Sequence, residues 1–144
     1  MSLSFRYKLI RRPDPVGENY SPMIPVLLKG DLKAINVLGL LDSGADFTVI
    51  PLEMAKYLGM DLSAKPEKVR GIGSVLEAIP SKILIVIQKG HESYQLFVRC
   101  KVIDGGDEDL PVLLGRADFF ENFSIIISDR EGIIRLKKNK AGCR

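Results

Sequence analysis

Short β-rich segments separated by turn residues run through almost all of this 144-residue chain. Val, Ile and Leu dominate the segments, and Gly, Pro, Asn or Asp stand between them. Many short strands at such intervals are typical of an all-β domain that is closed, or nearly closed, into a barrel. One helix is expected after Pro51, which suits a first helical turn, and Gly59 can end it in the left-handed conformation. A second short helix is expected over residues 117–122.

The strand boundaries follow from where the apolar and β-branched residues stop. Gly30-Asp31 indicates a hairpin turn, and residues 71–74, Gly-Ile-Gly-Ser, indicate a glycine-rich hairpin tip. The segment 37–41 is wholly apolar, so we expect it to be buried on both faces. Strands are expected over 5–10, 23–29, 33–41, 47–50, 69–79, 81–88, 93–103, 111–114, 124–128 and 132–136.

The length fits one ordinary domain with a real hydrophobic core. We expect an N-terminal extension over 1–22, the domain itself over 23–137 and a basic C-terminal tail over 138–144. No signal peptide is visible, and the longest apolar run, 83–87, is far shorter than a membrane span. We therefore expect a cytoplasmic protein with no membrane partner.

Composition excludes several classes of function. The net charge of +3 is too small to indicate a nucleic-acid partner. The two cysteines, Cys100 and Cys143, form no Cys-x-x-Cys pair and His91 is the single histidine, which argues against a metal site and against Ser-His-Asp or Cys-His catalysis. Residues 71–73 lack the third glycine of a dinucleotide fingerprint, so no cofactor is expected.

The triplet Asp42-Ser43-Gly44 is the feature that points to chemistry. On residue frequencies alone such a triplet arises in roughly one chain of this length in fifteen, and its residues also suit a plain turn. Its context is unusual, because the apolar segment 37–41 precedes it and strand-like residues return directly over 45–50. A surface turn does not normally lie between two such segments, so a carboxylate here should sit near the centre of the protein.

The segment 40–50, Leu-Leu-Asp-Ser-Gly-Ala-Asp-Phe-Thr-Val-Ile, resembles the active-site segment of the retroviral-type aspartic proteases, the retropepsins. Two further segments resemble that family in the right order. Residues 71–74, with the strand ending in 82–87, are similar to its flap hairpin, and residues 113–116, Leu-Leu-Gly-Arg, are similar to the strand that supports the active-site turn. The three matches span about 23–123, which makes the resemblance far more specific than the triplet alone.

The chain also departs from the viral enzymes. Ser43 stands where they usually have Thr, although the hydroxyl is kept. The expected hairpin over 124–136 makes the layout most similar to the cellular retropepsin-like domains of the DNA-damage-inducible type, in which the C-terminal strands help to build the dimer interface. The stretch up to Pro22 matches neither group clearly.

The resemblance implies a role for each matching residue. Asp42 supplies a catalytic carboxylate, Ser43 hydrogen-bonds across the dimer interface, and Gly44 lets the substrate backbone approach. Asp46 is expected to bind substrate backbone and to pair with Arg116, in bidentate geometry if the pair is buried. Gly115 and Arg116 support the turn. The remaining substrate contacts implied are Ala45, Gly71, Ile72, Gly73 and Ser74, within a cleft whose apolar lining is expected to include Ile72, Val75 and Leu113.

An aspartic peptidase needs two neighbouring carboxylates that share one proton, one acting as base on a water and the other polarising the scissile carbonyl. The sequence has one Asp-Ser-Gly turn, so the second carboxylate must come from a second copy. We therefore expect a homodimeric aspartic endopeptidase acting on a peptide or protein. The alternatives are a catalytically weak retropepsin-like domain used for dimerisation or peptide binding, and an unrelated β-barrel module with an accidental triplet.

Overall fold

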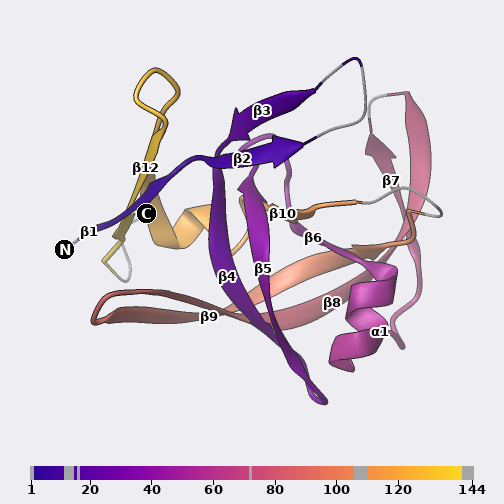
Figure 1. Cartoon of the computed structure of the whole chain (residues 1–144). Helices are drawn as coiled ribbons and strands as arrows, with labels where there is room; N and C mark the ends of the chain where they lie inside the picture. Colours follow the sequence, from indigo (N-terminus) through magenta and orange to yellow (C-terminus); the bar gives the residue numbers. More distant parts are fainter. Residues whose placement is uncertain (1, 12–14, 16, 72, 106–109, 141–144) are drawn as a thin grey trace.

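The computed structural model describes residues 2–11, 15, 17–71, 73–105 and 110–140. Its largest sheet closes on itself, because β4 pairs with β5 on one side and with β8 on the other (Figure 1). Around the ring the strands follow the order β4, β5, β10, β6, β9 and β8, and β7 pairs with β8 outside the ring. The bounds are β4 Met23–Lys29, β5 Ala34–Leu41, β6 Thr48–Pro51, β7 Glu67–Gly71, β8 Ser74–Lys89, β9 Glu92–Ile103 and β10 Val112–Leu114. The prediction of a closed all-β barrel is confirmed.

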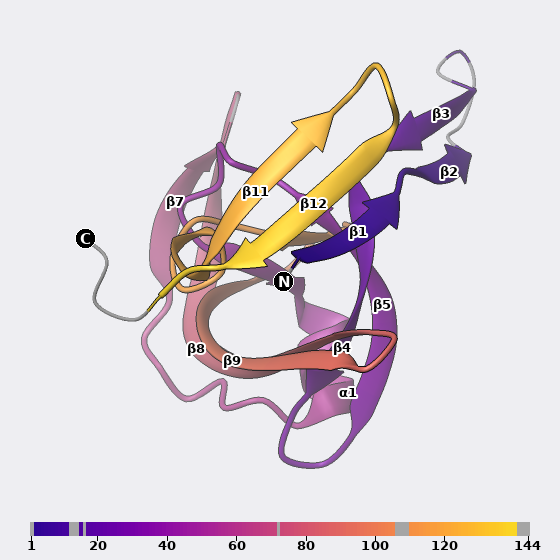
Figure 2. The same cartoon turned by 90° about the vertical axis from the view of Figure 1, so that its left-hand side faces the viewer.

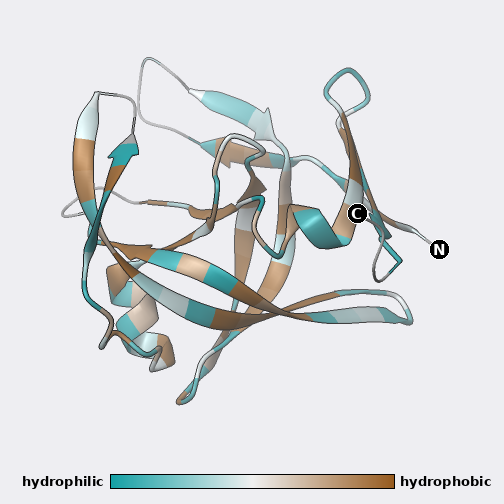
Figure 3. Cartoon of the chain, turned by 180° about the vertical axis from the view of Figure 1, so that it is seen from behind, coloured by the Kyte–Doolittle hydropathy of each residue, from teal (hydrophilic) through white to brown (hydrophobic). Residues whose placement is uncertain are grey.

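The barrel core is aliphatic because alternate residues of each strand point inward. The side chains that β8 and β9 bury almost completely illustrate this period of two: Ile83, Ile85, Ile87, Val98, Cys100 and Val102. Burying each large side chain contributes about 1.5–3 kcal/mol relative to leaving it exposed. Hydrophobic and hydrophilic bands follow one another along these long strands in Figure 3.

The one α-helix of the described residues, α1 (Leu52–Leu58), packs against the barrel through Ala55 and Leu58. It starts after Pro51, as expected, and stops at Gly59, which has a φ of 72°. A side chain at Gly59 would also collide with Leu32. The expected second helix is shorter than 117–122, because only Phe120–Asn122 forms a 3₁₀ turn. The part of the chain that the structure describes contains no membrane-spanning helix.

The two ends of the chain meet in a separate three-stranded sheet. There β1 (Ser2–Arg6) pairs with β12 (Ile133–Lys138), which pairs with β11 (Phe123–Ser128) (Figure 2). Leu3 lies opposite Leu136 and Phe5 lies opposite Ile134, and all four side chains are buried. The hydrophobic effect therefore joins the first strand to the last two.

Several strands differ in detail from the expectations. The strand expected over 5–10 is split at Tyr7 into β1 and β2 (Lys8–Arg11), and β2 pairs with an unforeseen strand, β3 (Glu18–Ser21). The hairpin strand and the strand expected over 81–88 form one continuous strand, β8. At Pro80 that strand has β9 alone as its neighbour, and a strand edge tolerates proline.

The end of β5 is also different from the expectation of burial on both faces. Leu41 is buried, whereas Leu38 is 37% exposed and Leu40 is half-buried. Burial alternates along β5, so one face of the strand is covered and the other meets solvent. The acidic loop expected over 104–109 falls mostly outside the described residues, as does Cys143.

Candidate active site

Asp42 begins the connection between β5 and β6, and its surroundings hold it in a defined position. Its backbone amide donates to the carbonyl of Leu114 at 3.0 Å, while its own carbonyl accepts from the amide of Ala45 at 3.1 Å. Its carboxylate Oδ1 accepts a hydrogen bond from the amide of Gly44 at 2.9 Å. The side chain is half-buried. The carboxylate is therefore oriented by the backbone of its own turn, as in other Asx turns.

The short strand β10 explains why the turn is rigid. It lies between the two strands that flank the turn, parallel to β5 and antiparallel to β6. Beyond β10, the amide of Arg116 donates to the carbonyl of Ala45, and the amide of Ala117 donates to the carbonyl of Asp46, both at 2.9 Å. Backbone hydrogen bonds from Arg116 and Ala117, which are distant in the sequence, therefore hold the turn in place.

Gly115 lies in close contact with the far side of the same turn. A Cβ at this position would stand 2.4 Å from the backbone carbonyl carbon and oxygen of Phe47, so only glycine fits. The amide of Gly115 donates to the hydroxyl Oγ1 of Thr48 at 3.2 Å, and Thr48 is completely buried. Residues on both sides of the turn are thereby locked against β10, which agrees with the supporting position expected for Gly115.

The expected pair between Asp46 and Arg116 is present, with the guanidinium Nη2 of Arg116 donating to Oδ1 of Asp46. The pair is neither buried nor bidentate. The side chains are 72% and 59% exposed, and one guanidinium nitrogen makes the contact. Both residues lie at the outer rim of the turn, where the protomer leaves them open to water.

The hairpin of β7 and β8 stands beyond the ring next to this turn. Gly71 pairs with Ser74 at its tip, and Gly73 has a φ of 80°, which a two-residue hairpin turn requires. Val69 and Leu76 are cross-strand partners, so their side chains share one face. Ile72 lies outside the described residues.

A cleft of about 750 Å³ separates the Asp42 turn from the β7–β8 hairpin. The predicted residues that line it are Asp42, Gly44, Ala45, Asp46 and Leu113. Its other apolar walls come from Val49, Val69, Leu76 and Ile103. An open cleft with apolar walls and one oriented carboxylate suits a peptide whose side chains near the carboxylate are hydrophobic.

Several other predicted residues do not line this cleft. Ser43 is exposed on the turn. Val75 is 59% exposed and does not line the cleft, although its cross-strand partner Arg70 does. The others that do not line it are Gly73, Ser74, Gly115 and Arg116.

Sequence reasoning missed a charged cluster at one end of the cleft. The ammonium of Lys101 lies 2.7 Å from the carboxylate of Glu67 and 4.6 Å from the ring centroid of Phe47. All three residues line the cleft, although they come from β9, β7 and the Asp42 turn. No local pattern brings these three positions together, so the sequence carries no signal for the cluster. Among the described residues, no group of acidic, His and Cys side chains is arranged to hold a metal ion.

Comparison with known proteins gives no match to a family model or to a curated protein. Among solved structures, the EIAV protease complexed with the inhibitor HBY-793 is 24% identical, with a TM-score of 0.49, over 67% of this chain and 82% of that chain. A retropepsin-like aspartic protease from Rickettsia conorii is 22% identical, with a TM-score of 0.57, over 94% of this chain and 91% of that chain. The agreement with the Rickettsia conorii structure runs through almost the whole length of both chains, and this chain therefore has the retropepsin-like fold.

Proposed function

We propose that the chain is one protomer of a homodimeric aspartic endopeptidase of the retropepsin family. The observation that carries the proposal is the place of Asp42, a half-buried carboxylate held by its own turn on the wall of a 750 Å³ cleft with apolar sides. The Rickettsia conorii protein, which shares the fold, is described as an aspartic protease. The fold argues against an unrelated β-barrel with an accidental triplet.

The chemistry requires Asp42 from each of two copies. Two carboxylates within contact distance cannot both ionise, so the pair holds one proton. The ionised carboxylate takes a proton from a water, which attacks the scissile carbonyl, while the protonated carboxylate hydrogen-bonds the carbonyl oxygen. Proton transfer to the amide nitrogen then releases the amine product. No covalent intermediate forms.

The remaining predicted residues position the reactants in this proposal. Ser43, exposed in the protomer, hydrogen-bonds across the two-fold axis, and Gly44 and Ala45 let the substrate backbone lie against the turn. Asp46 binds substrate backbone, and Arg116 orients it. The tip of the β7–β8 hairpin, formed by residues 71–74, closes over the peptide and excludes water.

The terminal sheet offers the surface for the second copy. Its edge strand β11 exposes two consecutive apolar residues, Ile126 at 57% and Ile127 at 41%, so both faces of that strand meet solvent in the protomer. An exposed apolar edge strand invites pairing with another chain. In this proposal, the second copy that covers β11 is the one that supplies the second Asp42.

The test is cleavage of a mixed peptide library from acid to neutral pH by the native chain and by Asp42→Asn. Native protein should cleave and Asp42→Asn should not, and a statine-type inhibitor should block the activity. Glu53→Gln, on the exposed face of α1, is the matched control and should retain activity. Equal cleavage by native protein and Asp42→Asn would refute the proposal.

A different result distinguishes the alternative function. Peptides that bind the native chain without being cleaved, at a protein concentration where the dimer is populated, would indicate a retropepsin-like domain for dimerisation or peptide binding. A protein that stays monomeric at every concentration in sedimentation equilibrium would contradict both functions, because the second carboxylate would then be absent.

A further inference from the structure

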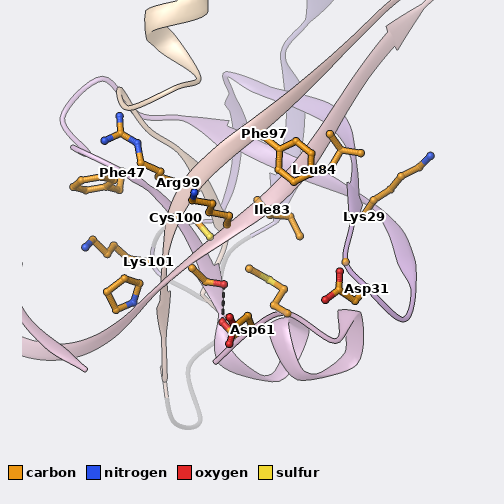
Figure 4. Close-up of a pocket in the computed structure, with 15 residues that line it drawn as sticks. Lys29, Asp31, Phe47, Asp61, Ile83, Leu84, Phe97, Arg99, Cys100 and Lys101 are labelled. Carbon is orange, nitrogen blue, oxygen red and sulfur yellow. Dashed lines mark hydrogen bonds between the residues drawn. The ribbon is translucent and has the colours of Figure 1, made fainter. Parts of the chain in front are cut away.

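A second groove lies on the outer face of the barrel, next to the end of the cleft that Phe47 and Lys101 form. It has a volume of about 890 Å³ and is lined by outward-facing side chains of β8 and β9, by the turn after β4 and by the segment after α1. Figure 4 shows Phe47 and Lys101 toward one end of this outer groove and Phe97 and Leu84 toward the other, with Lys29 and Asp31 beyond them. The mechanism proposed above assigns no role to Phe97 or Leu84, which form the far end of the outer groove.

The outer groove is continuous with the cleft. Phe47 and Lys101 line both of them, and the ammonium of Lys101 lies 4.6 Å from the Phe47 ring centroid. An extended polypeptide that leaves the cleft over this pair therefore enters the outer groove directly, without first crossing open solvent.

Three outward-facing cross-strand pairs form the wall of the outer groove on β8 and β9. Along β9 they are Lys101, Arg99 and Phe97, and their partners on β8 are Pro80, Lys82 and Leu84. Lys101 and Phe97 are four residues apart, which corresponds to roughly 13 Å along a strand. A substrate must therefore extend by about four residues beyond the cleft to reach the far end.

The far end is apolar and open. Phe97 is 74% exposed, and half-buried Leu84 lies opposite it. A large aromatic ring that is open to water on a strand, beside an aliphatic side chain, gains free energy when an apolar side chain covers it.

The middle of the outer groove is positively charged. Lys82 and Arg99 lie directly opposite each other, an arrangement of like charges that destabilises a sheet. Asp118 compensates for part of this repulsion, since its carboxylate accepts hydrogen bonds from the Arg99 amide at 2.9 Å and from Nε at 2.8 Å. Glu121 also lies near Arg99, whereas the exposed Lys82 forms no salt bridge within the part of the chain that the structure describes, so its ammonium can meet an acidic side chain of a ligand.

We propose that the outer groove is an accessory substrate site, which rests on the proposed peptidase function. It binds the stretch of polypeptide that continues beyond the cleft, with an acidic side chain facing Lys82 and an apolar side chain against Phe97 and Leu84. A homodimer has one outer groove in each protomer. The test therefore uses peptides lengthened at the amino end and peptides lengthened at the carboxyl end.

The experiment compares a peptide that fills the cleft alone with versions lengthened by six residues, in which Glu lies nearer the cleft and Leu two residues farther out, matching the spacing of Arg99 and Phe97 along β9. Native protein should show a KM about tenfold lower for a lengthened peptide, as expected from burying one large apolar side chain. Phe97→Ser should abolish this gain without changing kcat or the kinetics of the short peptide. Tyr20→Ser, which removes an exposed aromatic ring from β3 instead, is the matched control and should keep the gain.

Charge reversal tests the acidic position. Lys82→Glu should weaken binding of the Glu peptide and favour a peptide with Lys in its place. Equal KM values for short and lengthened peptides, or an equal effect of Phe97→Ser on both, would overturn the accessory site while leaving the peptidase function intact. If native protein cleaves neither peptide, the peptidase function fails. Fluorescence anisotropy then compares the binding of the short and lengthened peptides. Binding of the lengthened peptide that is no tighter than that of the short one would overturn the accessory site.

Discussion

The backbone amide of Arg116 donates a hydrogen bond to the carbonyl oxygen of Ala45 at 2.9 Å and so ties the end of β10 to the turn that carries Asp42. Together with the bond from the Asp42 amide to Leu114, this contact makes the turn part of the barrel wall and not a surface loop. A carboxylate on such a support keeps one orientation, as the proposed pairing of two carboxylates requires.

Gly115→Ala should destabilise the protein by about 2–3 kcal/mol, because its Cβ would meet the Phe47 backbone, which cannot move without displacing the turn. Gly39→Ala is the matched control, since its Cβ would meet the Leu114 side chain at 2.8 Å, and a side chain can repack. We expect a cost of about 1 kcal/mol at most for the control. Urea unfolding measures both, and equal losses would contradict the role of Gly115.

Thr48→Val should cost about 1–3 kcal/mol, because it keeps the shape of the side chain and leaves the buried Gly115 amide without its acceptor. Thr48→Ser keeps the hydroxyl and should cost less. Thermal unfolding of the two variants provides the comparison. A Thr48→Val protein as stable as the native one would show that this hydrogen bond is unimportant.

Asp118 should make stability depend on pH. Hydrogen bonds from Arg99 lower the pKa of this carboxyl, so the folded state favours the ionised form. The stabilisation is complete above the ordinary pKa of about 3.9 and is lost as the pH falls toward the lower pKa of the folded state.

Asp118→Asn should therefore cost about 1 kcal/mol at pH 7 and much less at pH 3. Asparagine also tolerates the φ of 63° at this position, so the substitution tests the charge and not the backbone. Denaturant unfolding at the two pH values measures the effect, and a loss that is the same at both would contradict it.

Cys100 should be unreactive in the folded protein. Burial raises the pKa of its thiol to about 12, and the side chain is 1% exposed. In a Cys143→Ser background, a thiol reagent at pH 8 should modify Cys100 at the rate at which the chain unfolds. Rapid modification of folded protein would be inconsistent with the closed barrel.

Ile126→Lys should weaken the proposed dimer at least tenfold, because it places a charge where β11 would meet the second copy. Sedimentation equilibrium measures the dissociation constant. Peptidase activity per protomer should then rise with protein concentration. Leu32→Lys, a change of an even more exposed apolar residue in the turn between β4 and β5, should leave the dimer unchanged.

Local patterns in the sequence determined much of this protein. The strand Met23–Lys29, the turn 42–44, the helix that stops at Gly59 and the hairpin tip at 71–74 each depend on residues that are neighbours in the chain, so propensity and turn chemistry predict them. The resemblance to the retropepsins added the pairing of Asp46 with Arg116, which the structure contains.

The tertiary structure alone decided which distant segments meet. It pairs β1 with β12, leaves one face of β5 open, and gathers Glu67, Lys101 and Phe47 at one end of the cleft. Residue patterns indicate which face of a strand is apolar, but they do not indicate which other strand packs against that face. That choice depends on the packing of the whole chain, because the free energy of burial is gained only when all the apolar faces are covered together.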